Sequence, residues 1–366
     1  MHVAADYLGV SVSRIIIGDC LTVLSTLESG SVQMCVTSPP YFGLRRYLPE
    51  NHPDAAHEIG TEATPELYVA AMVDVFRLVR DALADDGTIW INIGDSYTPV
   101  NQGENARPRI ETMTGIQVGN PHSDIRTKKE SIRAIAAMGL KAKDLIGIPW
   151  MLAFALRADG WYLRQDIIWA KPNPMPESVR DRCTKSHEYI FLLSKSAKYY
   201  YDADAIAEPL SYSSIERLSQ PRIGDQVGSD RVPGKTNGNM KAVFRASGTY
   251  NEDSGRNDGN RHPSGGYVTG AETRNKRSVW TVATQPYAEA HFATFPPDLI
   301  EPCILAGSKP GDMVLDPFGG SGTVGQVCES LGRQWLLIEL NPAYAKLAAA
   351  RTAQQGLQLS PKEVSA

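Results

Sequence analysis

Two adjacent prolines follow a short apolar segment near the start of this 366-residue chain. The apolar segment, residues 32–36, has the length and composition of a buried strand. Pro39 and Pro40 cannot continue a strand ladder, because proline lacks a backbone N–H and its φ is fixed. Ser38 and Tyr41 flank them, so hydrogen-bond acceptors and an aromatic ring meet at a stiff turn. Such a turn suits a planar ligand group that carries an NH2, although a purely structural turn with a buried tyrosine explains these residues equally well.

A glycine-rich turn near the C-terminus forms the second distinctive feature. It follows an apolar strand at residues 313–316 and has the sequence Pro-Phe-Gly-Gly-Ser-Gly-Thr. Glycines at such a place let a ligand approach the backbone between a strand and a helix. Glu339 ends the next strand, where a carboxylate can accept hydrogen bonds from ribose hydroxyls. Because this turn contains no Gly-Lys-Ser/Thr sequence, nucleoside triphosphate hydrolysis there is disfavoured, and an adenosine-containing ligand is indicated.

Strands and helices are expected to alternate along the chain, which indicates an α/β fold with parallel pairing of strands. Strands are expected at residues 13–17, 32–36, 88–93, 161–169, 187–193, 313–316 and 335–339. Helices are expected at residues 21–27, 66–84, 145–158, 297–306, 324–331 and 342–351. The sequence Asp85-Asp86-Gly87 is expected to end the second helix.

Two long polar segments interrupt this alternation. Residues 98–135 are rich in glycine, asparagine, proline and charge, which favours either a solvated mobile loop or a loop that closes over an anionic polymer. Residues 212–277 lack periodicity, and their basic residues outnumber the acidic ones. This second segment is expected to need a partner to become ordered, and a disordered surface insertion is the alternative.

Composition excludes several classes of protein. No apolar run of about 18 residues is present, so no membrane span is expected, and the N-terminus does not resemble a secretory signal. The five cysteines are scattered without CxxC pairs, so we expect no metal site, no disulfide framework and a reducing cytoplasm. The formal net charge of −4 slightly disfavours a nucleic-acid binder, and any such role must depend on local basic patches.

Taken together, the two motifs resemble those of the β-class DNA amino-methyltransferases, which use S-adenosylmethionine. Residues 316–323 match the family's cofactor motif, D-P-F-x-G-S-G-T, and residues 38–41 match its catalytic motif, [DNS]-P-P-[YFW]. Residues 17–20 resemble the segment that holds the adenine, and residues 291–296 resemble the segment that lines the methionine end. The catalytic motif precedes the cofactor motif, which is the β order.

The resemblance implies a Rossmann-like methyltransferase fold, with a twisted, mostly parallel sheet, helices on both faces and an inserted target-recognition region. Residues 14–204 would form the catalytic half, 205–280 the target-recognition region, 281–352 the cofactor-binding half and 353–366 a tail. Double-stranded DNA is the expected partner. A homodimer is expected by analogy, and the chain would act with a cognate restriction endonuclease or without one.

The resemblance also implies direct, in-line methyl transfer to the exocyclic amine of a flipped base. Ser38 places cytosine N4 slightly ahead of adenine N6. The candidate catalytic residues are Ser38, Pro39, Pro40 and Tyr41. The candidate cofactor-binding residues are Asp19, Cys20, Phe295, Asp316, Pro317, Phe318, Gly319, Gly320, Ser321, Gly322, Thr323 and Glu339. The candidate DNA-binding residues are Lys171, Asn173, Arg217, Arg222, Arg231, Lys235, Lys241 and Arg245.

Three alternatives stay open. The chain could be a DNA-binding relative without catalytic activity, or it could methylate an amine of RNA or protein. Methylation of cytosine at carbon 5 needs a cysteine nucleophile, and the one Pro-Cys pair is Pro302-Cys303. Its helical, apolar surroundings favour a core position for Cys303, so this third alternative is weak.

Overall fold

A computed structural model describes residues 13–43, 46–48, 52–98, 140–141, 143–218, 273–285 and 295–356. The chain divides into two compact units, one made of residues 1–202 and 278–366 and the other of residues 203–277. In the second unit, β6 (Glu208–Pro209) pairs antiparallel with β7 (Thr273–Arg274), and α5 spans Tyr212–Leu218. This unit overlaps the segment expected to recognise the target, and that role stays a prediction.

The first unit is built on an eight-stranded sheet in the order β1-β10-β9-β2-β3-β5-β4-β8. Only β5 runs antiparallel to its neighbours, and every other neighbouring pair in this sheet is parallel. The expected mostly parallel α/β sheet is therefore confirmed. The strands are β1 (Arg14–Ile17), β2 (Val32–Thr37), β3 (Leu83–Ile93), β4 (Tyr162–Ala170), β5 (His187–Ser194), β8 (Val279–Thr281), β9 (Met313–Asp316) and β10 (Gln334–Glu339).

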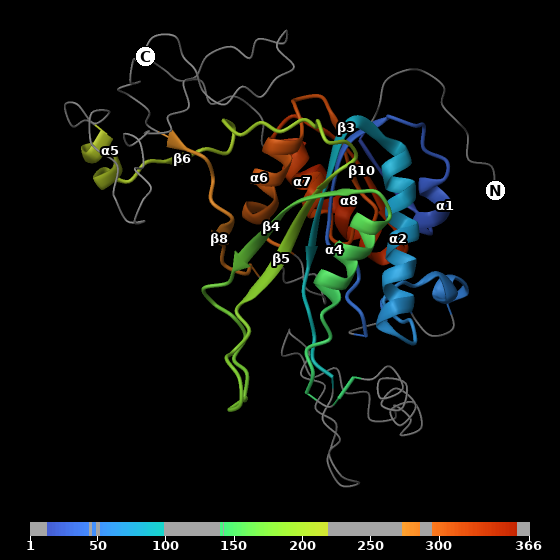
Figure 1. The fold of residues 1–366 in the computed structure, drawn as a ribbon. Coiled ribbons are helices and arrows are strands. Elements are labelled where there is room, and N and C mark those ends of the chain that lie inside the picture. The colour runs from blue at the N-terminus through green and yellow to red at the C-terminus, as the bar shows by residue number, and fades with distance from the viewer. Residues whose placement is uncertain are drawn as a thin grey trace. The chain divides into compact units, whose positions relative to one another are not determined.

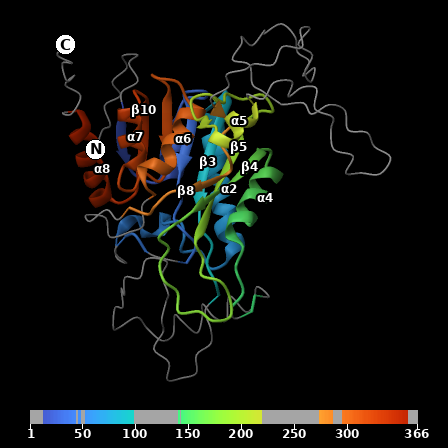
Figure 2. The same cartoon turned by 90° about the vertical axis from the view of Figure 1, so that its left-hand side faces the viewer.

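Helices cover both faces of this sheet (Figures 1 and 2). One face carries α1 (Cys20–Leu24), α2 (Pro65–Ala82) and α4 (Ile148–Ala158), and the other carries α6 (Pro297–Gly307), α7 (Thr323–Ser330) and α8 (Pro342–Gly356). A short 3-10 helix, η1, spans Pro53–His57. Successive side chains of a strand point to opposite faces of the sheet. Because helices cover both faces, the side chains on both faces are apolar.

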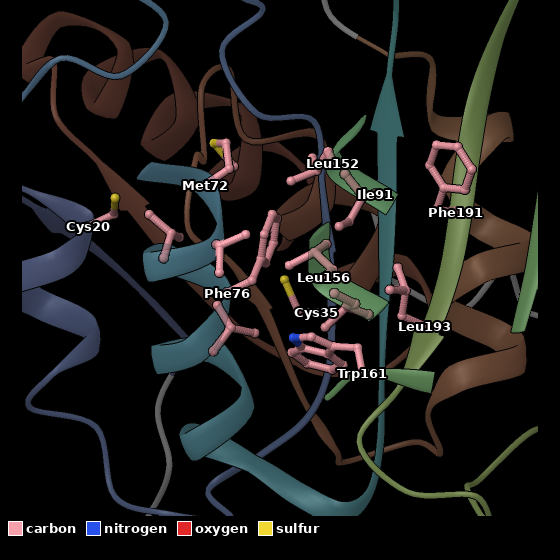
Figure 3. Packing of buried hydrophobic residues seen from close by; sticks show 14 of the residues in the cluster. Cys20, Cys35, Met72, Phe76, Ile91, Leu152, Leu156, Trp161, Phe191 and Leu193 are labelled. Carbon is pink, nitrogen blue, oxygen red and sulfur yellow. The ribbon is translucent and has the colours of Figure 1, made fainter. Parts of the chain in front are cut away.

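The central strand β3 shows this two-sided burial directly. Ile91 belongs to a buried cluster with Met72 and Phe76 of α2 and Leu152 of α4 (Figure 3). Trp90 faces the other side, where a Cβ at Gly307 of α6 would lie only 3.1 Å from its indole nitrogen. The sheet is thus packed on both faces, and the ends of its strands are where polar side chains can face a ligand.

Several element boundaries differ from expectation, and two of them have a clear physical cause. The second helix ends at Ala82 instead of continuing to residue 84, and β3 begins at once with Leu83. Leu83 is fully buried and pairs with Val32 of β2, with a register shift before Met34. Burial of this leucine and strand pairing outweigh the helical periodicity, so Asp85-Asp86-Gly87 lies within the strand.

The helix expected from residue 145 begins at Ile148. Gly147 precedes it with a φ of +88°, a left-handed conformation that suits glycine. The backbone N–H of Gly147 donates to both carboxylate oxygens of Asp95 at 3.0 Å, and that of Ile148 donates to Asp95 Oδ1 at 3.2 Å. Asp95 therefore caps α4 by accepting from its first free N–H groups. The apolar pattern of the sequence does not indicate this role of Asp95.

Candidate active site

The polar residues of both motifs gather at one edge of the sheet. Parallel strands end at the same edge, so the residues at or just after the ends of β1, β2, β9 and β10 come together there. Ser38, Asp316 and Glu339 occupy such positions. Because β5 runs in the opposite direction, its first residues reach the same edge, and Glu188 pairs there with Trp169 of β4.

A buried hydrogen bond joins the catalytic motif to the cofactor motif. Thr37 Oγ1 donates to Asp316 Oδ1 at 2.6 Å, and the backbone N–H of Phe318 donates to the same oxygen at 3.0 Å. Thr37 and Asp316 are both buried. Burial raises the pKa of Asp316 to about 7, and the hydrogen bonds from Thr37 and Phe318 limit that rise.

The glycine-rich turn is held by Glu339. Its Oε2 accepts from the backbone N–H of Gly320 at 2.7 Å, and its Oε1 accepts from that of Asn341 at 2.7 Å. Burial raises the pKa of Glu339 to about 7, while these backbone hydrogen bonds act to lower it. An ionised carboxylate oxygen has more than one lone-pair site, so each can also accept from a ligand hydroxyl.

Two glycines of the turn are required by close packing. A Cβ at Gly319 would lie 2.9 Å from the Cβ of Leu337 in β10. Gly322 has a φ of +80°, and a Cβ there would lie 2.8 Å from Ala348 of α8. The backbone of the turn therefore sits directly against its neighbours, as the spacing of these glycines indicates.

Arg351 of α8 is a further residue that contacts this turn. Its Nη1 donates to Ser321 Oγ at 3.0 Å and to Thr323 Oγ1 at 2.9 Å, and its Nε donates to Gln326 Oε1 at 2.6 Å. Sequence patterns do not indicate Arg351, because its role depends on how the last helix packs against α7. Arg351 ties the two hydroxyls of the motif to α8.

The segment expected to hold adenine lies beside Glu339. The backbone N–H of Gly18 donates to the carbonyl of Glu339 at 3.0 Å. Asp19 is the N-cap of α1, where its Oδ2 accepts from the backbone N–H of Thr22 at 2.9 Å. Cys20 is buried, and that burial raises its pKa to about 12. The cap role of Asp19 is thus present, and ligand contacts by Asp19 and Cys20 stay predictions.

The remaining cofactor candidates are placed as follows. Phe318 packs against the buried cluster with part of its side chain exposed, and Pro317 precedes it in the turn. Phe295 is half-buried, two residues before α6. Residues 291–294, which were expected to line the methionine end with it, lie outside the described residues.

Two tyrosines fix the proline-containing catalytic motif. Tyr41 Oη donates to Glu188 Oε2 at 2.7 Å, and Tyr68 Oη of α2 donates to the carbonyl of Pro40 at 2.8 Å. Burial, together with the negative charge of Glu188, raises the pKa of Tyr41. Pro39 is buried, whereas Ser38 is half-buried at the surface of the site. The motif is therefore anchored on both sides while its serine stays accessible.

Glu188 is a site residue that the sequence motifs do not include. Its Oε1 forms an ion pair with Lys171 Nζ, and its Oε2 accepts from Asn92 Nδ2 at 3.3 Å as well as from Tyr41. The only signal in the sequence is a charged residue at the start of an apolar strand. That signal does not indicate which strands lie beside it.

The DNA-binding candidates divide into two groups. Lys171 pairs with Glu188, and Asn173 exchanges two hydrogen bonds with the backbone of Thr284, at 3.0 and 3.3 Å. Arg217 lies in α5. The other candidates lie outside the described residues and comprise Arg222, Arg231, Lys235, Lys241 and Arg245. All eight DNA contacts stay predictions.

Cys303, the alternative nucleophile, is fully buried in α6. Its placement in the core agrees with the expectation from sequence. Cys303 therefore does not lie with the two motifs at the edge of the sheet, which we call the site edge. In the part of the chain that the structure describes, no group of three or more His, Cys, Asp or Glu side chains could hold a metal ion. Across the same residues, no helix is both long and apolar enough to cross a membrane.

A family model of DNA methylases, N6_N4_Mtase, matches residues 32–350. The chain belongs to this family. It is 43% identical over 334 residues to the type II methyltransferase M.Cfr9I of Citrobacter freundii, covering 91% of this chain and 85% of that one. It is 42% identical over 338 residues to the type II methyltransferase M.SmaI of Serratia marcescens, covering 92% and 90%. This DNA methylase is therefore an S-adenosylmethionine-dependent DNA amino-methyltransferase, as the two motifs indicate.

Solved structures support the fold of this DNA methylase. The cytosine-N4-specific PvuII DNA methyltransferase aligns with a TM-score of 0.50 at 18% identity, covering 97% of this chain and 89% of that one. The Thermus thermophilus protein TTHA0409, in complex with S-adenosyl-L-methionine, aligns with a TM-score of 0.50 at 20% identity, covering 94% of each chain. At these identities the comparison establishes the methyltransferase fold.

Proposed function

We propose that this DNA methylase transfers a methyl group directly to the exocyclic amine of a target base held beside Ser38 and Pro39. Cytosine N4 is the first candidate, because serine begins the catalytic motif, and adenine N6 is the second. The observation that carries this proposal is the Thr37–Asp316 hydrogen bond. It keeps the catalytic motif next to the glycine-rich turn of residues 317–323, which we call the cofactor turn. The methyl donor and the target amine can then be held side by side at one edge of the sheet.

The cofactor turn has the features that an adenosine-containing ligand requires. Glycine backbone lies between β9 and α7, and Glu339, which is 9% exposed, lies next to it. We assign ribose binding to Glu339 and adenine binding to the segment around Asp19. S-adenosylmethionine, when bound, supplies an electrophilic methyl group. The protein's own contribution is to hold the ligand and the base in a fixed geometry.

The chemistry of the acceptor explains the polar groups of the catalytic motif. An exocyclic base amine is a poor nucleophile, because its lone pair is delocalised into the ring. The hydroxyl oxygen of Ser38 and the carbonyl oxygen of Pro39 would accept hydrogen bonds from the two N–H groups of this amine. These bonds favour a pyramidal nitrogen. The lone pair then points toward the methyl group, and no covalent enzyme intermediate is needed. Orientation of the two reactants supplies most of the rate.

The target base must leave the helix to reach this site, since it is stacked and paired in duplex DNA. The ring of Tyr41 is the candidate for stacking on a flipped base, and the basic segment 205–280 is the candidate for contacting the DNA. The named relatives are type II methyltransferases, which favours a role beside a restriction endonuclease. A homodimer remains a prediction from family analogy, and light scattering of the purified protein tests it.

The test supplies the purified protein with radiolabelled S-adenosylmethionine and competing duplex DNA, RNA and protein acceptors. The expected result is label in duplex DNA at a defined sequence, which modified-base sequencing of DNA from expressing cells then locates. Label in RNA or protein would contradict the proposal. DNA binding without any transfer would instead identify a non-catalytic relative.

A further inference from the structure

The carboxylate of Glu188 connects the catalytic tyrosine to a buried cation. Its Oε2 accepts from Tyr41 Oη at 2.7 Å, and its Oε1 is paired with the ammonium of Lys171. The side chains of Glu188 and Lys171 are 6% and 16% exposed. Neither Glu188 nor this connection belongs to the motifs that identify the family in the sequence.

Each member of this network is fixed by further contacts. Asn92 of β3 donates to Glu188 Oε2 at 3.3 Å and to the carbonyl of Tyr189 at 3.2 Å. Lys171 Nζ lies 4.1 Å from the ring centroid of Trp169, and its backbone N–H donates to Ser186 O at 2.8 Å. The charge of Glu188 is therefore both paired and hydrogen-bonded, which is the condition for keeping a carboxylate buried.

The ring of Tyr41 is also held by close contact with the backbone. A Cβ at Gly94, just past the end of β3, would lie 2.8 Å from Tyr41 Cε2 and 3.3 Å from Glu188 Cδ. The ring thus rests against bare backbone on one side while its hydroxyl is bound to Glu188. With both contacts in place, the ring has one position and one orientation beside Ser38.

A buried ion pair is weak evidence for a stabilising role, since apolar side chains of similar size often stabilise a core equally well. The location of this pair points elsewhere, because it lies at the site edge and bonds directly to the catalytic motif. We infer that Glu188 is a positioning residue, which holds the Tyr41 ring where it stacks on the target base, and that Lys171 is its counter-ion. This inference rests on the proposed function.

The test compares Tyr41→Phe, Glu188→Gln and the double variant in single-turnover methyl transfer with saturating cofactor and duplex DNA. Tyr41→Phe removes the hydrogen bond to Glu188, whereas Glu188→Gln replaces the charged acceptor with a neutral amide and breaks the ion pair with Lys171, so each rate is expected to fall roughly 10- to 100-fold. The double variant should be no slower than the slower single variant, because both changes act through the Tyr41–Glu188 contact. Affinity for S-adenosylmethionine should stay unchanged.

A second readout separates positioning from stability. A fluorescent 2-aminopurine at the target position reports an unstacked base, and its signal should be smaller with Glu188→Gln than with the unaltered protein. Asp159→Asn is the matched control: the side chain of Asp159 is 11% exposed and pairs with Arg77 at 2.6 Å, at the C-terminal end of α4 away from the site edge. This control should lose stability without losing the 2-aminopurine signal.

Lys171→Met tests the assignment of the counter-ion. If Lys171 pairs with Glu188, methyl transfer falls while the salt dependence of DNA binding stays the same. A decrease of about 0.9 in the slope of log K against log salt would show a phosphate contact and overturn the counter-ion assignment. Full transfer by Glu188→Gln, or additive effects in the double variant, would overturn the positioning role. Absence of transfer by the unaltered protein would overturn the proposed function and this inference with it.

Discussion

The hydroxyl of Thr37 donates a 2.6 Å hydrogen bond to the carboxylate of Asp316, across 279 residues of sequence. The two residues end the neighbouring parallel strands β2 and β9. One immediately precedes the catalytic motif, and the other begins the cofactor turn. Because both side chains are buried and hydrogen-bonded to each other, a shift of one side chain displaces the other.

Thr37→Val should weaken cofactor binding. The change keeps the shape of the side chain but leaves the Asp316 carboxylate without one of its two donors, which costs about 1–3 kcal/mol in a buried place. Isothermal titration should show a Kd for S-adenosylmethionine roughly tenfold higher. Thr88→Val is the matched control, since Thr88 is similarly buried in β3 and accepts from Trp90 Nε1 at 3.2 Å, near the amino end of the sheet strands. An equal loss of cofactor affinity in the control would contradict the specific role of Thr37.

Ser38→Ala should remove most methyl transfer while cofactor binding is retained. The serine is half-buried and lies outside the cofactor turn, so its loss should change neither folding nor the affinity for S-adenosylmethionine. The measurement is the single-turnover rate together with the cofactor Kd. Survival of normal transfer would show that the Ser38 hydroxyl is not an acceptor for the target amine.

Two glycine variants should separate the two halves of the site. Gly94→Ala places a Cβ against the ring of Tyr41, and we expect slower transfer with normal cofactor affinity. Gly319→Ala places a Cβ 2.9 Å from Leu337 Cβ under the cofactor turn, and we expect weaker cofactor binding. Rates and cofactor Kd values measured side by side test this contrast. The same pattern of losses in both variants would contradict it.

The contribution of Asp316 and Glu339 to the stability of the free protein should fall as pH rises from about 4 through 7. Asp316 and Glu339 have pKa values raised to about 7 in the folded chain, so the native state holds protons that the unfolded state has already released above its ordinary carboxyl pKa. Unfolding then releases protons. Each group therefore lowers the free energy of unfolding by up to about 1.4 kcal/mol per pH unit within this window. The loss is complete about one pH unit above 7, where both groups are ionised in the folded state as well.

Urea unfolding at pH 5, 6 and 8, without cofactor, measures this dependence. Asp316→Asn and Glu339→Gln should each flatten the pH profile, because the amide does not titrate. A profile that keeps its slope in both variants would assign the dependence to other groups. Binding of S-adenosylmethionine, which is cationic at sulfur, should in turn strengthen as pH rises through 7 and both carboxyl groups ionise.

The strand ends that carry the two motifs could be predicted from sequence, because apolar runs followed by proline or glycine are local signals. The carboxylate of Glu188 could not be placed in this way. Its contact with Tyr41 depends on the antiparallel direction of β5 and on its register with Trp169, and both are set by the packing of the whole sheet. Arg351 was missed for the same reason, since its contact requires the position of α8.

The boundary between the second helix and the third strand shows a different limit. Helical periodicity continues through Leu83, but this residue is fully buried as the first residue of β3 and pairs with Val32. Tertiary burial decided between two locally acceptable conformations. Element type was thus predictable where the pattern was long, and the exact boundary depended on partners distant in the sequence.

Nucleoside mass spectrometry of duplex DNA treated with the purified protein and S-adenosylmethionine tests the central claim most directly. Transfer to an exocyclic amine predicts N4-methylcytosine or N6-methyladenine in the digest, and most of that product should be lost with Ser38→Ala. Formation of 5-methylcytosine, or recovery of only unmodified nucleosides after incubation with the unaltered protein, would contradict the account.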